Sequence, residues 1–317
     1  MQRSIQFWRL SGSGGSEMPG TFPAAEFVKV LREAEANDLD RHRVCRNGMT
    51  VIAHSAGISP HPMVLLDKVR RENYPSVGDR AGRRQPMRLQ EGEGLLEPTY
   101  FSFLDNNVVA ALVNGNGPHP QRLAEYIRLK FRTPVGLVPV LRRDLDAVLR
   151  RMRITEVEVA VPAERLDREL VGGDWVAALD GARSLSHDGV IRIGLSVGQK
   201  GDAFYKASFS EHVRTLVDQL RQATGFGDLT TARVAGSVRG DRQVVDLIND
   251  RFVERVDVDP DKFGDPERAT NYARDVLTAV ADRTKDYLEG TLPVAPASYI
   301  ALGDFDEAID NEQQRPT

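Results

Sequence analysis

The sequence is poor in cysteine, in aromatic residues and in long apolar runs. Of its 317 residues one is cysteine, and 7% are Phe, Trp or Tyr. The single thiol, Cys45, cannot form an intrachain disulfide, which excludes a disulfide-stabilised scaffold. No apolar run approaches the roughly 18–20 residues that cross a bilayer, and residues 1–10 do not have the pattern of a secretory signal. We therefore expect a cytoplasmic protein without membrane insertion.

The chain also lacks an overall excess of positive charge. Its 42 Lys and Arg stand against 46 Asp and Glu, which gives a formal net charge of −4. The net charge therefore does not indicate that the whole surface binds nucleic acid, but it is compatible with local basic patches. The 41% of hydrophobic and 28% of charged residues are typical of a globular protein with one large or two medium domains.

The alternation of strand and helix patterns predicts an α+β fold, with mixed sheets and flanking helices. Apolar residues at helical spacing predict helices, and two-residue alternation predicts strands. Helices are expected over residues 24–37, 121–131, 142–152, 211–224 and 266–289. Strands are expected over 5–10, 50–54, 63–69, 99–103, 108–113, 135–140, 157–161, 190–197, 231–238, 243–248 and 251–258. Asn and Gly tolerate positive φ, so residues 105–107 and 239–241 are expected to be hairpin turns.

This order of elements predicts two lobes that meet near residues 150–155. Residues 1–150 would form an N-terminal α+β lobe with an Arg-rich loop. Residues 151–290 would form a C-terminal α+β lobe that ends in a long helix. Residues 291–317 are expected to be an acidic flexible tail, because the segment is first Pro-rich and then dominated by acids.

The clearest charge feature is a basic window over residues 41–90. It holds ten Lys or Arg and three acids, so its charge is +7 (10 − 3) inside an acidic protein. Arginine pairs with phosphate through two hydrogen bonds, and tyrosine stacks on bases. The window therefore predicts binding of nucleic acid or another polyanion, by Arg70, Arg71, Tyr74, Arg83, Arg84 and Arg88.

A second basic group lies at the expected lobe boundary. Together with the basic window it would form a groove that binds a nucleic-acid backbone. It consists of Arg142, Arg143, Arg150, Arg151 and Arg153. For both groups an alternative stays open, in which the arginines pair with acids elsewhere in the chain or with the acidic tail of another copy.

Motifs for catalysis are weaker, and whether the protein is an enzyme stays open. Residues 194–201 lack the spacing and the hydroxyl of a phosphate-binding loop, and the six histidines do not have zinc-site spacing. His54 precedes Ser55, but a catalytic pair needs a geometry that sequence does not show. Cys45, between Arg43 and Arg46, fits either an activated nucleophile or a buried strand residue.

One acidic group suits a divalent metal. Glu254, Asp257 and Asp259 are the residues that would hold the metal of a metal-dependent nuclease, in which the cation bridges protein and phosphate. Outside this nuclease alternative we expect no cofactor.

Several short segments carry a resemblance to a known group of proteins. They are Arg71-Glu-Asn-Tyr-Pro75, Gly92-Glu-Gly-Leu-Leu-Glu-Pro-Thr-Tyr-Phe101, the apolar run 108–113 with the loop 114–118, and Val234-Ala-Gly-Ser-Val-Arg-Gly240 followed by Val244-Val-Asp-Leu247. Together these segments make up 37 of the 317 residues. The sequence resembles uncharacterised bacterial proteins of phage-defence islands, and is distantly similar to the DNA-binding component of the Kiwa system. The resemblance implies a cytoplasmic protein that acts in phage defence beside partner proteins, and it carries over no catalytic residue.

The leading hypothesis is a subunit of a bacterial anti-phage defence system that binds nucleic acid or a protein partner through its Arg-rich surface. One alternative is the metal-dependent nuclease. Another is a structural assembly protein whose long C-terminal helix and acidic tail build a homo-oligomer. A phage protein that counters such defences would share these features.

Overall fold

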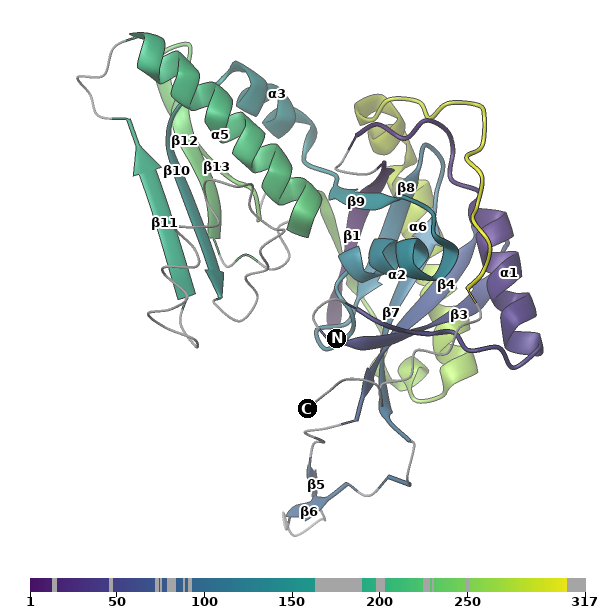
Figure 1. Cartoon of the computed structure of the whole chain (residues 1–317). Helices are drawn as coiled ribbons and strands as arrows, with labels where there is room; N and C mark the ends of the chain where they lie inside the picture. Colours follow the sequence, from purple (N-terminus) through teal and green to yellow (C-terminus); the bar gives the residue numbers. More distant parts are fainter. Residues whose placement is uncertain are drawn as a thin grey trace.

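The described part of the chain forms two larger antiparallel sheets with flanking helices, which confirms the expected α+β fold (Figure 1). The structure is a computed structural model. It describes residues 1–12, 16–45, 48–71, 74, 76–78, 84–87, 89–90, 93–162, 190–197, 203–224, 229, 231–248 and 251–306. For residues 76–78, 143–146, 162, 203 and 219–224 it describes the backbone alone.

The larger sheet has the strand order β14-β1-β8-β7-β4-β3-β2, and β9 pairs with the end of β1. Its neighbouring strands all run antiparallel. The strands are β1 (Gln2–Ser11), β2 (His42–Val44), β3 (Thr50–Gly57), β4 (Met63–Arg70), β7 (Leu95–Phe103), β8 (Val108–Val113), β9 (Gly136–Pro139) and β14 (Val253–Asp257).

Helices cover both faces of this larger sheet. One face carries α1 (Ala24–Ala36) and α2 (Gln121–Phe131), and the other carries α6 (Pro266–Thr291), which follows the short 3₁₀ helix η4 (Pro260–Phe263). The α1 helix buries one stripe at helical spacing, formed by Phe27, Val28, Leu31 and Ala34. The α6 helix begins where Asp265 caps it, because the carboxylate of Asp265 accepts a hydrogen bond from the Arg268 amide at 2.8 Å.

Both hairpin turns expected from the sequence are confirmed. Asn106 and Asn107 have φ angles of 57° and 59°, and they connect β7 to β8. Arg239 and Gly240 have φ angles of 54° and 97°, and they connect the strands of the second hairpin. Two successive residues with positive φ give the turn the twist that antiparallel strands need.

The smaller sheet has the order β11-β10-β12-β13. Its strands are β10 (Arg153–Pro162), β11 (Val190–Ser196), β12 (Thr231–Val238) and β13 (Asp241–Asp246). One face packs against α3 (Arg143–Arg151) and α5 (Ala203–Thr224) through an apolar cluster that includes Leu149, Val157, Val213, Leu216 and Val234. The α5 helix begins before residue 211, where the sequence predicts its start.

The sheets do not follow the order of the chain. After the smaller sheet the chain returns to the larger one, where β14 pairs with β1 and α6 packs on the face. The smaller sheet is therefore an insertion between β9 and β14. This differs from the predicted C-terminal lobe of residues 151–290, because the long helix assigned to that lobe covers the larger sheet instead. The division into two lobes stays a prediction.

Residues 295–306, which we call the C-terminal strap, lie along the α1–α2 face (Figure 1). Ile300, Leu302 and Phe305 contact the apolar cluster beneath α1 and α2. The Ile300 amide donates to the Thr21 carbonyl at 2.9 Å, and Asp306 forms an ion pair with Arg43 at 2.9 Å. The predicted flexible tail is therefore corrected for these residues, because their apolar side chains bury on the core. Residues 307–317 lie outside the described part.

The long helix α6 uses its apolar stripe inside the chain. Its buried residues, which include Ala269, Ala273, Leu277 and Val280, contact the larger sheet. That stripe is therefore not free to build the homo-oligomer of the assembly alternative, and a homo-oligomer stays a prediction. Within the described residues, none of the helices has the length and apolar character to pass through a bilayer.

Candidate polyanion-binding surface and a partly buried polar cluster

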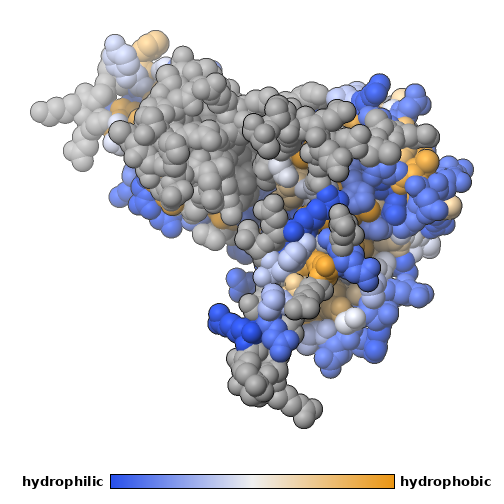
Figure 2. All heavy atoms as spheres, turned by 60° about the horizontal axis from the view of Figure 1, so that its bottom comes forward, coloured by the Kyte–Doolittle hydropathy of each residue, from blue (hydrophilic) through white to orange (hydrophobic). Residues whose placement is uncertain are grey.

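The Arg-rich segment between β4 and β7 forms a projecting hairpin. Its strands, β5 (Ser76–Gly78) and β6 (Arg84–Pro86), pair antiparallel and lie beyond the ends of β4 and β7, outside the larger sheet (Figure 1). All three residues of β6 are exposed. Figure 2 brings this end forward and shows mainly hydrophilic residues on the described surface around it. We call this hairpin, together with Arg71 and Tyr74, the arm.

Four of the six predicted binding residues are described, and they differ in their surroundings. Arg71 and Arg84 are exposed, and Tyr74 is half-buried. Arg70 forms an ion pair with Glu97, and 27% of its side chain is exposed. The remaining two, Arg83 and Arg88, lie outside the described residues.

Acids from other elements neutralise much of the basic window. Arg41 pairs with Glu35 of α1 at 2.9 Å, and Arg43 pairs with Asp306 of the strap at 2.9 Å. Glu97 of β7 accepts both Arg70 and Lys68, the latter at 3.1 Å. For these four cations the alternative of pairing elsewhere in the chain therefore holds. Arg84 is different, because it is exposed and makes no ion pair within the described part of the chain.

The arginines of the second basic group are more exposed and less often paired with acids than those of the basic window. It surrounds α3 and the start of β10, and four of its members are exposed without an ion pair to any described residue: Arg142, Arg150, Arg151 and Arg153. The side chain of the fifth, Arg143, lies outside the described part. Unpaired arginines on a surface create the local positive potential that attracts phosphate.

The three acids of the nuclease alternative do not converge. The Glu254 carboxylate forms an ion pair with Arg283 of α6 at 2.9 Å. Asp257, three residues later on the same strand, faces the opposite side of the sheet. The carboxylate of Asp259 accepts the Asp261 amide at 3.1 Å and caps η4. Within the described residues, three or more His, Cys, Asp or Glu side chains do not gather into a group that could hold a metal ion.

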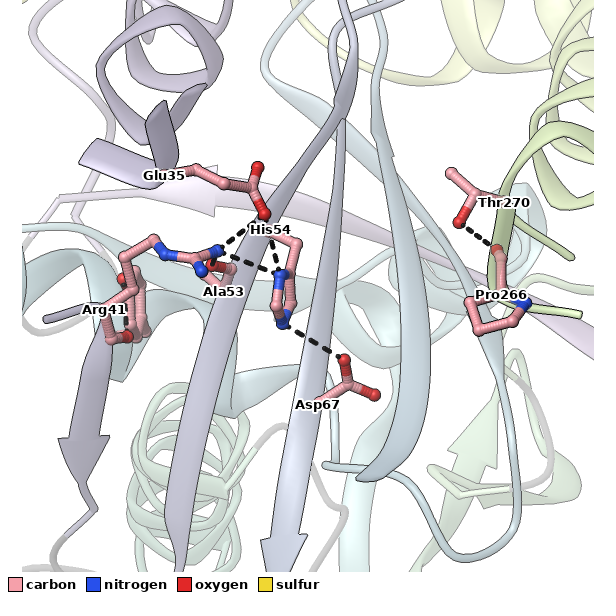
Figure 3. A network of polar contacts seen from close by, with 8 residues as sticks. Glu35, Arg41, Ala53, His54, Asp67, Pro266 and Thr270 are labelled. Carbon is pink, nitrogen blue, oxygen red and sulfur yellow. Dashed lines mark hydrogen bonds and ion pairs between the residues drawn. The ribbon is translucent and has the colours of Figure 1, made fainter. Parts of the chain in front are cut away.

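A partly buried polar cluster joins α1, the loop after it, β3 and β4 (Figure 3). The Nδ1 atom of His54 lies 3.1 Å from Glu35 and 2.9 Å from Arg41, and its Nε2 atom lies 3.6 Å from Asp67. Arg41 also donates to the Ala53 carbonyl at 3.2 Å. Because Nε2 is buried and two side chains engage Nδ1, neither nitrogen is placed to activate an external nucleophile. This geometry gives His54 a structural role.

The protonation of this cluster is set by its burial. Burial raises the pKa of Asp67 to about 7, and only 4% of that side chain is exposed. Burial lowers the pKa of His54, while its hydrogen bond to Glu35 opposes this effect. Burial, and secondly the Asp67 carboxylate, raise the pKa of Tyr100 to about 12 against the opposing charge of Arg3. Below about pH 7 the folded protein therefore favours a protonated Asp67, and burial disfavours a charge on the imidazole beside it.

Cys45 does not have the surroundings of a nucleophile. Its side chain is 1% exposed, and burial, together with the nearby Glu125, raises the pKa of its thiol. A reactive cysteine needs access and a lowered pKa. The buried-residue interpretation of Cys45 is therefore the one that the structure supports.

Comparison with known proteins adds no relative. No protein-family model matches the chain, and no curated protein matches its sequence significantly. The resemblance to phage-defence proteins therefore stays a prediction. The structure itself defines an α+β protein with an exposed arm and a basic surface around α3.

Proposed function

We propose that the protein binds nucleic acid, and that the arm contacts the phosphate backbone. The observation that carries this proposal is Arg84, which stands exposed on a projecting hairpin without an acidic partner among the described residues. Arg71 is exposed where the arm leaves β4, and Tyr74 adds an aromatic ring. Arginine donates in a fixed fork that suits phosphate oxygens, so a hairpin of this kind fits a polyanion.

Reversal of two arm charges is expected to weaken binding and to reduce its salt dependence. In Arg71→Glu/Arg84→Glu, the affinity for a fluorescein-labelled 20-base-pair DNA should fall about tenfold or more at low salt, since phosphate contacts dominate such binding. The slope of log K against log salt should become shallower by about 2, because each lost phosphate contact removes about one unit. Fluorescence anisotropy over a salt series measures both quantities.

A control variant matched in net charge reverses two arginines outside the arm. Arg255→Glu/Arg268→Glu reverses two exposed arginines on β14 and α6, outside the arm. This variant should keep the wild-type slope. Equal slopes for the arm variant and the wild type would contradict the proposed role of the arm.

We further propose that this binding serves a bacterial anti-phage defence system that contains a partner protein. The support is the resemblance of short segments, one of which includes Tyr74 of the arm. Bacteria that express the chain with its neighbouring genes should plate phage less efficiently than bacteria with an empty vector, and Arg71→Glu/Arg84→Glu should restore plating. Equal plating with the wild-type chain and with the empty vector would contradict this role.

A further inference from the structure

A corner of the chain outside the arm combines basic and aromatic side chains. The corner is the junction of α3 and β10, where Arg150 and Arg151 end the helix and Arg153 begins the strand. All three are exposed and make no ion pair with the described residues. Arg242 of β13 is not equivalent, because it forms an ion pair with Glu156 at 3.5 Å.

Two neighbouring aromatic rings stand exposed at the start of α5. Phe204 is 74% and Tyr205 is 68% exposed, and their ring centroids lie 6.0 Å apart in an edge-to-face arrangement. Other residues of α5, which include Val213, Leu216 and Val217, form its apolar contact with the smaller sheet. Both rings thus stay largely exposed while α5 packs on its sheet through these other residues. Large exposed aromatic residues in such a pair are typical of binding surfaces.

Hydrogen bonds hold the middle of α5 beside the α3–β10 corner. The Ser210 hydroxyl donates to the Ile154 carbonyl at 3.0 Å, directly after Arg153. The Arg214 guanidinium donates to the carbonyls of Leu149 and Met152 at 3.3 and 2.7 Å. Tyr205 precedes Ser210 by five residues and Arg214 by nine, so Tyr205 lies about 8 Å along the helix axis from the first anchor and about 14 Å from the second. Arginines and rings thus occupy one end of the smaller sheet.

We propose that this end of the smaller sheet binds single-stranded nucleic acid, with Arg150, Arg151 and Arg153 on the backbone and Phe204 and Tyr205 stacked on bases. The charges here suit phosphate, and exposed rings suit unpaired bases, whereas a duplex keeps its bases stacked inside. The inference rests on the proposed nucleic-acid function and deepens it, because it names the class of ligand and a second site.

The test measures base stacking separately from charge. Purified full-length protein is titrated with a labelled 20-nucleotide oligothymidylate and with an abasic strand of the same length. The wild type should prefer the strand that carries bases. In Phe204→Ala/Tyr205→Ala, the affinity for oligothymidylate should fall about tenfold or more, since each stacked base contributes roughly a fivefold or larger factor. The affinity for the abasic strand should stay the same.

Two control variants separate this site from its alternatives. Tyr299→Ala removes an equally exposed ring, 72% exposed, from the strap, and it should leave both affinities unchanged. Arg151→Glu/Arg153→Glu should weaken binding of both strands alike, because phosphates are present in each. Circular dichroism and melting curves for every variant establish that the fold is retained.

The outcomes distinguish this inference from the proposed function. If the wild type binds nucleic acid and Phe204→Ala/Tyr205→Ala binds oligothymidylate as well as the wild type does, the second site is wrong and the arm proposal stands. If the aromatic variant loses binding while Arg71→Glu/Arg84→Glu does not, the second site stands and the arm proposal is wrong. If the wild type binds neither duplex nor single strand, both proposals are wrong.

Discussion

Replacement of Gly303 by alanine is expected to lower the free energy of unfolding by about 2–3 kcal/mol. A Cβ atom on Gly303 would lie 1.9 Å from the Phe131 carbonyl oxygen, a distance that real contacts do not reach. That oxygen belongs to the backbone at the end of α2, so the strap must move instead. A displaced strap would lose the packing of Phe305 on Phe131, whose ring centroids lie 5.4 Å apart, and the ion pair of Asp306 with Arg43.

Thermal unfolding followed by circular dichroism measures this effect. The melting temperature should fall by about 5 °C or more in Gly303→Ala. Gly115→Ala is the matched control, because a Cβ atom there meets nothing within 4 Å, and its melting temperature should stay close to that of the wild type. Equal melting temperatures for the two variants would show that the strap contributes little to stability.

Much of the fold follows from local sequence patterns. The asparagines at 106 and 107 give the first hairpin its turn, and the helical stripe around Phe27 gives α1 its buried face. The pairing of distant segments is different, because no local pattern encodes it. The hydroxyl of Thr21 donates to the Pro296 carbonyl at 2.6 Å across 275 positions, and an acidic, Pro-rich segment of that kind predicts flexibility when it is considered alone.

The candidate site could be predicted only in part, for a related reason. A charge count over residues 41–90 omits the partner strand, and in the sheet Lys68 of β4 lies directly opposite Glu97 of β7. Cross-strand neighbours of opposite charge pair readily. The register of β4 and β7 would have indicated this neutralisation. Phe204 and Tyr205 were missed because the helix prediction begins at residue 211, after both rings.

Asp67 is expected to make the free energy of unfolding depend on pH. Its pKa of about 7 in the folded protein lies above the ordinary value of 3.8, so folding favours the protonated carboxyl. The stability that this group supports is complete below about pH 4 and is lost as the pH rises to about 7. Asp67→Asn is neutral at every pH. Its stability relative to the wild type should therefore increase by about 2–3 kcal/mol between pH 5 and pH 8.

The imidazole of His54 also titrates, and burial lowers its pKa. Its titration adds a second pH dependence, which a variant without this imidazole removes. Urea unfolding at several pH values should therefore also compare His54→Gln with His54→Gln/Asp67→Asn, in which no imidazole titrates at this position. The same increase towards pH 8 is expected in that pair. An Asp67 that is ionised and pairs with a protonated His54 across their 3.6 Å separation would have a pKa below 3.8, so Asp67→Asn would then become less stable relative to the wild type as the pH rises from about 3 to about 5. The sign of the change between about pH 3 and about pH 5, where a raised pKa of Asp67 predicts a relative gain for Asp67→Asn and an ion pair predicts a relative loss, thus decides between a protonated and an ionised Asp67.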